Sequence, residues 1–173
     1  MNEYVFDIEA NGLTPDKIHC LVVNAGDLGT KTFTDELEDL NIWGKEDSYL
    51  IGHNIIQYDV PVLERILDIK VKAELVDTLA LSWYLFPNRV KHGLASWGED
   101  FGIPKPLIDD WENLTQEEYL HRCKEDVKIN TMLWELQKKY LIDIYGSLEE
   151  AMPLIRYLSF KMDCARVQEE TKW

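Results

Sequence analysis

Residues 4–12, with the sequence YVFDIEANG, decide the fold that this chain is expected to adopt. Their apolar side chains are typical of a buried strand, and the Asn-Gly pair at Asn11 and Gly12 is a turn signal that ends it. Side chains alternate between the two faces of a strand, so Asp7 and Glu9 should share one face. The stretch therefore predicts a strand that carries two carboxylates near its end.

Two carboxylates on one face, next to apolar residues, repel each other and lose hydration. A hard divalent cation compensates both effects, because such ions prefer oxygen ligands. For Asp7 and Glu9 alone, two solvated acids at the end of a strand are the simpler interpretation. The metal interpretation therefore depends on further carboxylates later in the chain.

The composition indicates one compact domain with a strongly negative charge. The chain has 173 residues, of which 46% are hydrophobic, which is enough for a sizeable core. Its 32 acidic and 18 basic residues give a formal net charge of −14, which opposes tight non-specific binding of nucleic acid through phosphates. An enzyme that takes one nucleic-acid end into a cation-loaded cleft stays compatible with this charge, because bound cations invert the local potential.

Cysteine usage and hydropathy predict a reduced, cytoplasmic setting. The three cysteines, Cys20, Cys123 and Cys164, are odd in number, show no C-x-x-C spacing and follow no secretory segment. No apolar run approaches the length that spans a membrane, so we expect a soluble protein without a membrane partner.

Further strands and helices alternate along the chain, which predicts an α/β fold. Strand composition recurs at residues 18–24, 31–34, 48–53 and 72–76. Turn residues between the first two of these predict an antiparallel meander with the first strand. Helical patterns follow Asp59, Asp77 and His92, and two longer ones cover residues 115–140 and 148–170. Thr115 and Glu118 form a capping-box signal for the first of the long helices.

Carboxylates stand where three of these elements begin or end: Asp7 and Glu9, then Asp59, then Asp126. Four acids suffice for a site with two cations. Two metal ions about 4 Å apart can activate a water on one side of a phosphodiester and stabilise the leaving oxygen on the other.

The stretches that hold these acids carry a family resemblance. DIEAN at residues 7–11, GHN at 52–54 leading to Tyr58 and Asp59, and CKEDV at 123–127 resemble the three exonuclease motifs of the DEDD 3′–5′ exonuclease superfamily. The resemblance is closest to the proofreading domain of phage family A DNA polymerases and covers about the whole chain. One such motif is a weak signal, whereas three in order are a specific one.

The resemblance implies a ribonuclease-H-like α/β fold, with a five-stranded mixed sheet flanked by helices and the acids at its centre. It implies two divalent cations, Mg²⁺ or Mn²⁺, with Asp7 bridging both. The implied metal ligands are Asp7, Glu9, Asp59 and Asp126. The implied substrate-binding residues are Asn54 and Tyr58, which match positions that hold the terminal nucleotide, together with Ala10 and Asn11.

Each residue also has a simpler interpretation when taken alone. Asp59 could be only a helix N-cap and Asp126 only a solvated helix residue. Asn54 could satisfy loop backbone, and Tyr58 could be part of the core. Asp77 is expected to be a helix cap or a residue behind the ligands rather than a ligand itself.

The residue that activates the attacking water is less clearly indicated. In the superfamily it is a tyrosine four positions before the last aspartate or a histidine five positions before it. Here these positions hold Arg122 and His121, so His121 is the predicted catalytic residue. If the helix begins at Thr115, however, Arg122 rather than His121 shares the face of Asp126. Tyr119, seven positions back, would share that face as well.

The predicted function is metal-dependent 3′–5′ hydrolysis of single-stranded or frayed DNA ends to nucleoside 5′-monophosphates. Residues 1–145 would form the exonuclease domain. Residues 146–173 resemble the helix that leads into a polymerase domain, so a polymerase partner in cis or in trans is expected beside the DNA 3′ end. A monomer in the host or bacterial cytoplasm is expected. The alternatives are a catalytically weak end-binding or polymerase-docking module and an RNA-trimming exonuclease.

Overall fold

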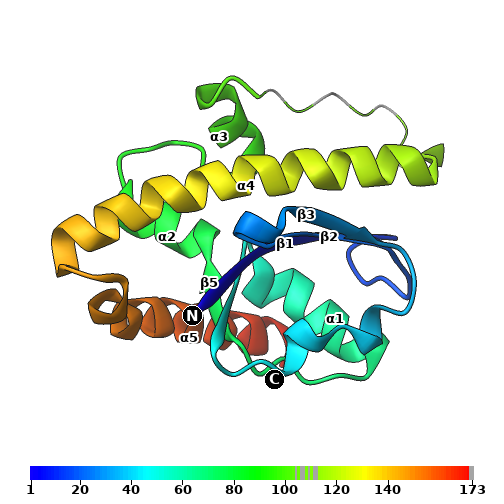
Figure 1. The fold of residues 1–173 in the computed structure, drawn as a ribbon, viewed down its shortest axis with the longest axis horizontal. Coiled ribbons are helices and arrows are strands. Elements are labelled where there is room, and N and C mark those ends of the chain that lie inside the picture. Colours follow the sequence, from blue (N-terminus) through cyan, green and yellow to red (C-terminus); the bar gives the residue numbers. More distant parts are fainter. Residues whose placement is uncertain (104, 106–107, 109, 111–112, 172–173) are drawn as a thin grey trace.

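The structure is a computed structural model that describes residues 1–103, 105, 108, 110 and 113–171. A five-stranded mixed sheet with the order β3-β2-β1-β4-β5 forms its centre (Figure 1). Its strands are β1 (Asn2–Ala10), β2 (Ile18–Asn24), β3 (Thr30–Phe33), β4 (Ser48–Gly52) and β5 (Glu74–Asp77). The predicted ribonuclease-H-like sheet and its antiparallel meander are confirmed.

The central strand β1 is longer than its neighbour β4, and this difference creates a free strand edge. β1 pairs antiparallel with β2 from Val5 to Ala10, with an irregular register after Glu9. Its parallel pairing with β4 ends at Val5, which lies opposite Ile51. The second half of β1, which carries Asp7 and Glu9, therefore has no strand neighbour on that side.

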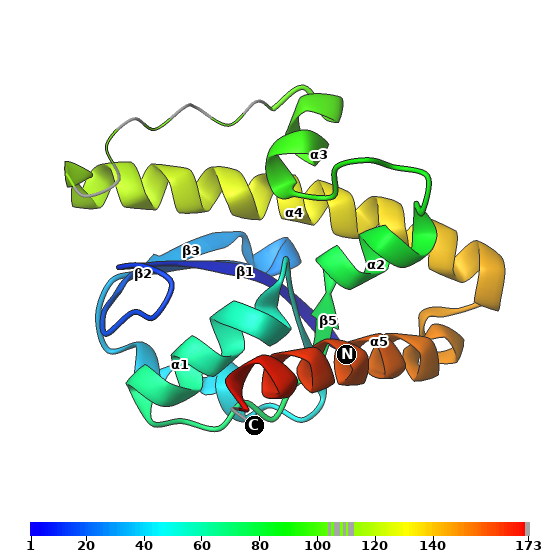
Figure 2. The ribbon, with the colours of Figure 1, turned by 180° about the vertical axis from the view of Figure 1, so that it is seen from behind.

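Helices cover both faces of the sheet. They are α1 (Val60–Leu67), α2 (Thr78–Leu85), α3 (Leu94–Asp100), α4 (Gln116–Tyr145) and α5 (Leu148–Glu170). The long α4 crosses one face, α1 covers the other, and α5 runs past β5 (Figures 1 and 2). Among the described residues, no helix has both the length and the apolar character needed to cross a membrane.

Strand alternation decides which side chains of β1 face which helix. Phe6 and Ile8 belong to the core on the side of α1, together with Leu63. Val5 belongs to the core on the side of α4, together with Val127. Asp7 and Glu9 follow Val5 with a period of two, so they continue the face that α4 covers.

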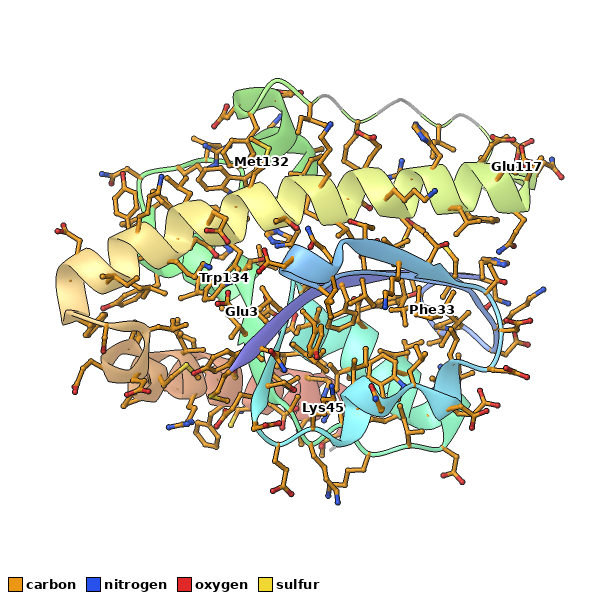
Figure 3. All side chains as sticks on the ribbon, in the orientation of Figure 1. Glu3, Phe33, Lys45, Glu117, Met132 and Trp134 are labelled. Atoms are coloured by element: carbon orange, nitrogen blue, oxygen red, sulfur yellow. The ribbon has the colours of Figure 1, made fainter. Side chains whose placement is uncertain are left out.

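Contacts at the start of β1 set the position of α4 along the strand. The indole N–H of Trp134 donates to the carboxylate of Glu3, and both side chains lie between α4 and β1 (Figure 3). The Lys138 ammonium lies 3.0 Å from the same carboxylate. Asp126 precedes Trp134 by two helical turns, which is about 12 Å, and Asp7 follows Glu3 by about 13 Å of strand. The same packing therefore places Asp126 over Asp7.

The helix starts agree with the capping signals in the sequence. Thr115 forms the predicted capping box with Glu118 at the start of α4, and Asp77 caps α2. The sequence did not predict the π-helical turn Ile55–Asp59, which precedes α1. α5 buries Ala151, Met152 and Ile155 in the same core as α4, and the proposed boundary after residue 145 stays a prediction.

Candidate metal centre

Three of the four predicted ligands come together on the α4 face of β1. Carboxylate oxygens of Asp7, Glu9 and Asp126 all lie within 4.8 Å of one another. Asp126 is buried, whereas Asp7 and Glu9 are half-buried. Two residues from the middle strand and one from the facing helix thus form a compact group of oxygen atoms.

The fourth predicted ligand, Asp59, approaches from the π-helical turn at the end of β4. It is buried, and its Oδ2 atom has no hydrogen-bond partner in the described part of the chain. Burial raises the pKa of Asp59 well above its usual range, and a hydrogen bond from the backbone N–H of Ile8 partly offsets that increase in pKa. Asp59 lies outside the 4.8 Å group, but its charge contributes to raising the pKa of Asp7.

The burial and close approach of these acids are electrostatically unfavourable. Burial raises the pKa of Asp7 well above its usual range. The charges of Asp126, Asp59 and Glu9 raise this pKa further. The thiol of Cys123, 3.4 Å from Asp7 Oδ2, donates a hydrogen bond that acts in the opposite direction on the pKa. In the absence of cations, the structure therefore favours the protonated form of Asp7.

Two basic residues partly compensate this charge. Lys105 Nζ lies 2.7 Å from Asp126 Oδ1, and Arg122 Nε lies 3.8 Å from Glu9 Oε1. Burial and the charge of Asp126 raise the pKa of Glu9 to about 7, although Arg122 and Lys105 each lower this pKa. The Lys105 contact was not predicted, because Lys105 and Asp126 belong to different segments and share no spacing signal.

Two of the predicted substrate-binding residues, Asn54 and Tyr58, come from the segment that also carries Asp59. Asn54 adopts the left-handed conformation with φ of 62°, and its buried Oδ1 atom has no hydrogen-bond partner among the residues described. The Tyr58 hydroxyl donates to the carbonyl oxygen of Gly12 at 2.6 Å. Burial raises the pKa of Tyr58, and the charges of Asp59, Glu9 and Asp7 raise it further.

Ala10 and Asn11 occupy the end of β1 and the loop behind it. Ala10 is half-buried and follows the register shift. The Asn11 side-chain oxygen accepts the backbone N–H groups of Asp16 and Lys17, each at 3.0 Å. The described contacts of Asn11 therefore organise the loop, and a role in substrate binding stays a prediction for both residues.

The structure does not bring His121 into the group of acids. α4 begins at Gln116, so residues four apart share a face, and Arg122 rather than His121 faces the acids. His121 is exposed. Tyr119 is half-buried and stacks on His19 with ring centroids 4.1 Å apart. The catalytic role of His121 stays a prediction, and it would require the ring to reach the acids from the outer face of α4.

The donor set fits hard divalent cations. All four predicted ligands are carboxylates, which suit Mg²⁺ or Mn²⁺ better than softer metals. The Oδ2 atom of Asp59, which has no hydrogen-bond partner within the described residues, and the raised pKa values of Asp7 and Glu9 are what carboxylates show when no cation balances them. Asp7, Glu9, Asp59 and Asp126 are thus the residues that would hold the metal ions.

Comparison with solved structures supports this fold. Brucella melitensis NrnC with bound Mg²⁺ has a TM-score of 0.70 to this chain at 14% sequence identity, covering 99% of this chain and 88% of NrnC. The same protein bound to pGG has a TM-score of 0.69 at 14% identity, covering 94% and 83%. The catalytic core of RRP6 from Trypanosoma brucei has a TM-score of 0.63 at 16% identity, covering 91% and 45%.

A similar fold also occurs within a much larger protein. The family B DNA polymerase from the archaeon Pyrobaculum calidifontis has a TM-score of 0.62 at 21% identity, covering 91% of this chain and 27% of the polymerase. No protein-family model matches the sequence, and no curated protein matches it. The chain therefore has the ribonuclease-H-like fold seen in DEDD 3′–5′ exonucleases.

Proposed function

We propose that this protein is a metal-dependent 3′–5′ exonuclease that hydrolyses single-stranded or frayed DNA ends to nucleoside 5′-monophosphates. The observation that carries the proposal is the convergence of Asp7, Glu9 and Asp126 on one point, with Asp59 close by. The similar fold of NrnC, which has been seen with Mg²⁺ and with pGG, supports a nuclease rather than another activity.

In the proposed reaction, the residues of the chain hold the substrate and the cations in place. When bound, the divalent cations would activate a water and stabilise the leaving oxygen. The side-chain oxygen of Asn54, which has no hydrogen-bond partner among the described residues, would hold the terminal nucleotide together with Tyr58. Lys105 and Arg122 keep positive charge beside the acids, where a phosphate of the substrate would arrive. Two cations and these two basic residues would offset the negative charge that otherwise repels DNA.

A cleavage assay with matched DNA and RNA tests this proposal. Single strands of one sequence, labelled at the 5′ end, are incubated with the protein and Mn²⁺ or with EDTA. The proposal predicts a ladder of stepwise shorter DNA products, formed only with the metal ion. Asp7→Ala serves as the control for a contaminating nuclease, since it should form no ladder.

The same assay separates the alternatives. Faster shortening of RNA than of DNA would indicate an RNA-trimming enzyme, which shares the metal chemistry but receives the 2′-hydroxyl differently. Intact strands that are nevertheless retained by the protein would indicate an end-binding or docking module. The exposed position of His121 and the presence of Arg122 at the tyrosine position favour this second candidate, because both leave the water-activating residue unassigned.

The biological context that we propose is proofreading by a phage family A DNA polymerase. Two resemblances support this context. The three motifs resemble those of the proofreading domain, and the sequence of α5 resembles the segment that leads into a polymerase domain. Addition of a polymerase of that family would test it: mismatched 3′ ends should be removed faster than matched ends when the two proteins act together.

A further inference from the structure

Asp77, at the end of β5, is a buried carboxylate that contacts three backbone N–H groups. Its Oδ1 atom accepts from Leu79 and Asn54, both at 3.0 Å, and its Oδ2 atom accepts from Ile56 at 3.1 Å. Only 2% of the residue surface is exposed. The Leu79 contact is an ordinary helix N-cap. The other two bonds reach a segment more than 20 positions earlier in the chain.

That earlier segment carries two of the candidate site residues. It runs from Asn54 through the π-helical turn to Asp59, the last residue before α1. A left-handed conformation is unfavourable for a residue with a side chain, and a π-helical turn is rare, so both need support from the surroundings. Asn54 Oδ1 and Asp59 Oδ2, at the two ends of this segment, are buried atoms without a hydrogen-bond partner in the described chain.

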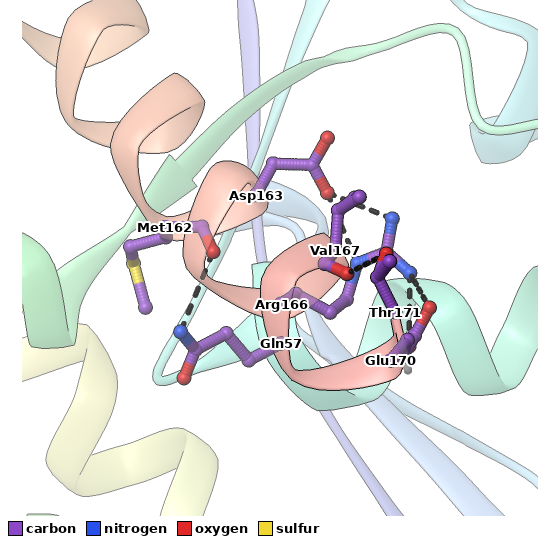
Figure 4. A network of polar contacts seen from close by, with 7 residues as sticks. All are labelled: Gln57, Met162, Asp163, Arg166, Val167, Glu170 and Thr171. Atoms are coloured by element: carbon purple, nitrogen blue, oxygen red, sulfur yellow. Dashed lines mark hydrogen bonds and ion pairs between the residues drawn. The ribbon is translucent and has the colours of Figure 1, made fainter. Parts of the chain in front are cut away.

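Other contacts restrain the later residues of the segment, among them the 2.6 Å hydrogen bond from the Tyr58 hydroxyl to the carbonyl oxygen of Gly12. Gln57 Nε2 donates to the carbonyl oxygen of Met162 on α5 at 3.4 Å (Figure 4). On the strand side, Gly52 leaves room for Ile55, whose Cγ2 atom would lie only 2.3 Å from an added Cβ. The bonds to Asp77 are the charge-assisted contacts at the first residues of the segment, where the chain turns out of β4.

We propose that Asp77 is a positioning residue of the candidate nuclease site. It fixes the backbone of Asn54 and Ile56, and this holds the side-chain amide of Asn54 in place for the substrate and the carboxylate of Asp59 in place for a metal ion. This inference rests on the proposed function. A helix cap alone requires one acceptor oxygen, which a serine would supply. The carboxylate is needed because its two oxygens join the start of α2 to the start of the π-helical turn.

Two substitutions separate the positioning role from the cap. Asp77→Ser keeps an oxygen that can accept the N–H of Leu79, but it is too short to reach Asn54 and Ile56. Asp77→Asn keeps the size of the side chain and replaces one acceptor oxygen by an amino group, which cannot accept a hydrogen bond. Asp68→Asn is the matched control, since it removes one negative charge from an exposed left-handed residue at the other end of α1.

The first measurement uses the metal-free protein and amide hydrogen exchange. In Asp77→Ser, the backbone N–H groups of Asn54 and Ile56 should exchange at least about tenfold faster, because each loses a hydrogen bond to a charged acceptor. The Leu79 amide should keep most of its protection. Equal protection of Asn54 and Ile56 in wild type and in both Asp77 variants would overturn the proposal.

The second measurement is the affinity for Mn²⁺, followed by electron paramagnetic resonance. Both Asp77 variants should bind Mn²⁺ more weakly, by about 10- to 100-fold for Asp77→Ser, as is typical when a residue behind the metal ligands is lost. Asp68→Asn should bind as the wild type does. Wild-type Mn²⁺ affinity in both Asp77 variants, with only a lower melting temperature, would show that Asp77 is merely a cap.

The third measurement is the cleavage rate as a function of Mn²⁺ concentration. High Mn²⁺ should restore part of the lost kcat in Asp77→Asn, whereas the lost interaction of Asn54 with the substrate should leave KM raised. If the wild type itself cleaves no nucleic acid, the proposed function fails. Hydrogen exchange and Mn²⁺ affinity still decide the role of Asp77 in that case.

Discussion

Two sets of carboxylates with little exposure to solvent lie at the ends of strands β1, β4 and β5, and they differ in what surrounds them. Asp77 is surrounded by backbone N–H donors, which lower its pKa and partly offset the increase that burial causes. Burial raises the pKa values of Asp7 and Asp59 well above the usual range, and the charges of acidic neighbours raise them further. Backbone hydrogen bonds thus satisfy the carboxylate of Asp77, whereas the carboxylates of Asp7 and Asp59 are left for a cation.

This difference separates a structural acid from a ligand more reliably than burial does. A carboxylate that already accepts several hydrogen bonds has little left to offer a metal ion, and its loss removes bonds that hold the fold. A carboxylate packed against other carboxylates destabilises the metal-free fold and gains most from a cation. Substitutions in the two sets should therefore act in opposite directions on the stability of the metal-free protein.

The largest expected effect is the loss of cleavage on removal of one acid of the metal centre. Asp7→Ala or Asp126→Ala should lower the cleavage rate by more than about 100-fold, since even residues behind metal ligands contribute 10- to 100-fold. The measurement is the rate of shortening of a labelled oligonucleotide in Mg²⁺. Circular dichroism controls for the fold, and a variant that keeps the wild-type rate would remove that residue from the ligand set.

Stability without metal should distinguish the two sets by sign. Asp77→Ala should lower the free energy of unfolding by roughly 2–4 kcal/mol, because three bonds to a charged acceptor, one of them the helix cap, are lost. Asp7→Asn should raise it by on the order of 1 kcal/mol, because like-charge repulsion is relieved. Urea unfolding in EDTA measures both changes, and destabilisation by Asp7→Asn would contradict the comparison.

The stability of the metal-free protein should also depend on pH through Glu9. Its pKa is raised from 4.5 to about 7 in the fold. Between these two pH values, the folded state therefore holds a proton that the unfolded state has lost. This contribution is complete below pH 4.5 and is lost as the pH rises through 7. The melting temperature of the wild type in EDTA should accordingly fall more steeply between pH 5 and pH 8 than that of Glu9→Gln.

Two controls define this pH effect. His53 acts in the opposite direction, because burial lowers its pKa to about 4 and the protein loses stability as the pH falls from 6.5. The difference between wild type and Glu9→Gln removes this contribution, which both proteins share. Saturating Mn²⁺ should raise the melting temperature. It should also reduce the pH dependence of the melting temperature that Glu9 causes, since ligation requires the ionised carboxylate. Parallel curves for the two proteins in EDTA would refute the assignment.

The sequence predicted most of the fold because its signals are local. Strand alternation placed Asp7 and Glu9 on one face, and the Thr115 capping box set the start of α4. The contacts that were missed join segments far apart in sequence, such as Lys105 with Asp126, or depend on an irregular backbone, such as the π-helical turn after Asn54. Neither periodicity nor residue type records which distant N–H groups a buried carboxylate will meet.

The smallest expected effect concerns two neighbours on α4, Arg122 and His121. The resemblance predicts a loss of about 10²-fold or more for His121→Ala if the ring is the general base. The position of His121 on the exposed face of α4 leads us to expect a loss of less than about tenfold, below the range of general acid–base catalysis.

Arg122→Gln should have the larger effect, because Arg122 faces Glu9 and lowers the pKa of that carboxylate. Its loss should raise the pKa of Glu9 further and shift metal-dependent cleavage to higher pH. Rate–pH profiles of the two variants and of Tyr119→Phe decide between these expectations. A His121→Ala rate reduced by 10²-fold or more, with Mn²⁺ affinity unchanged, would show that the start of α4 rearranges to bring the histidine to the acids.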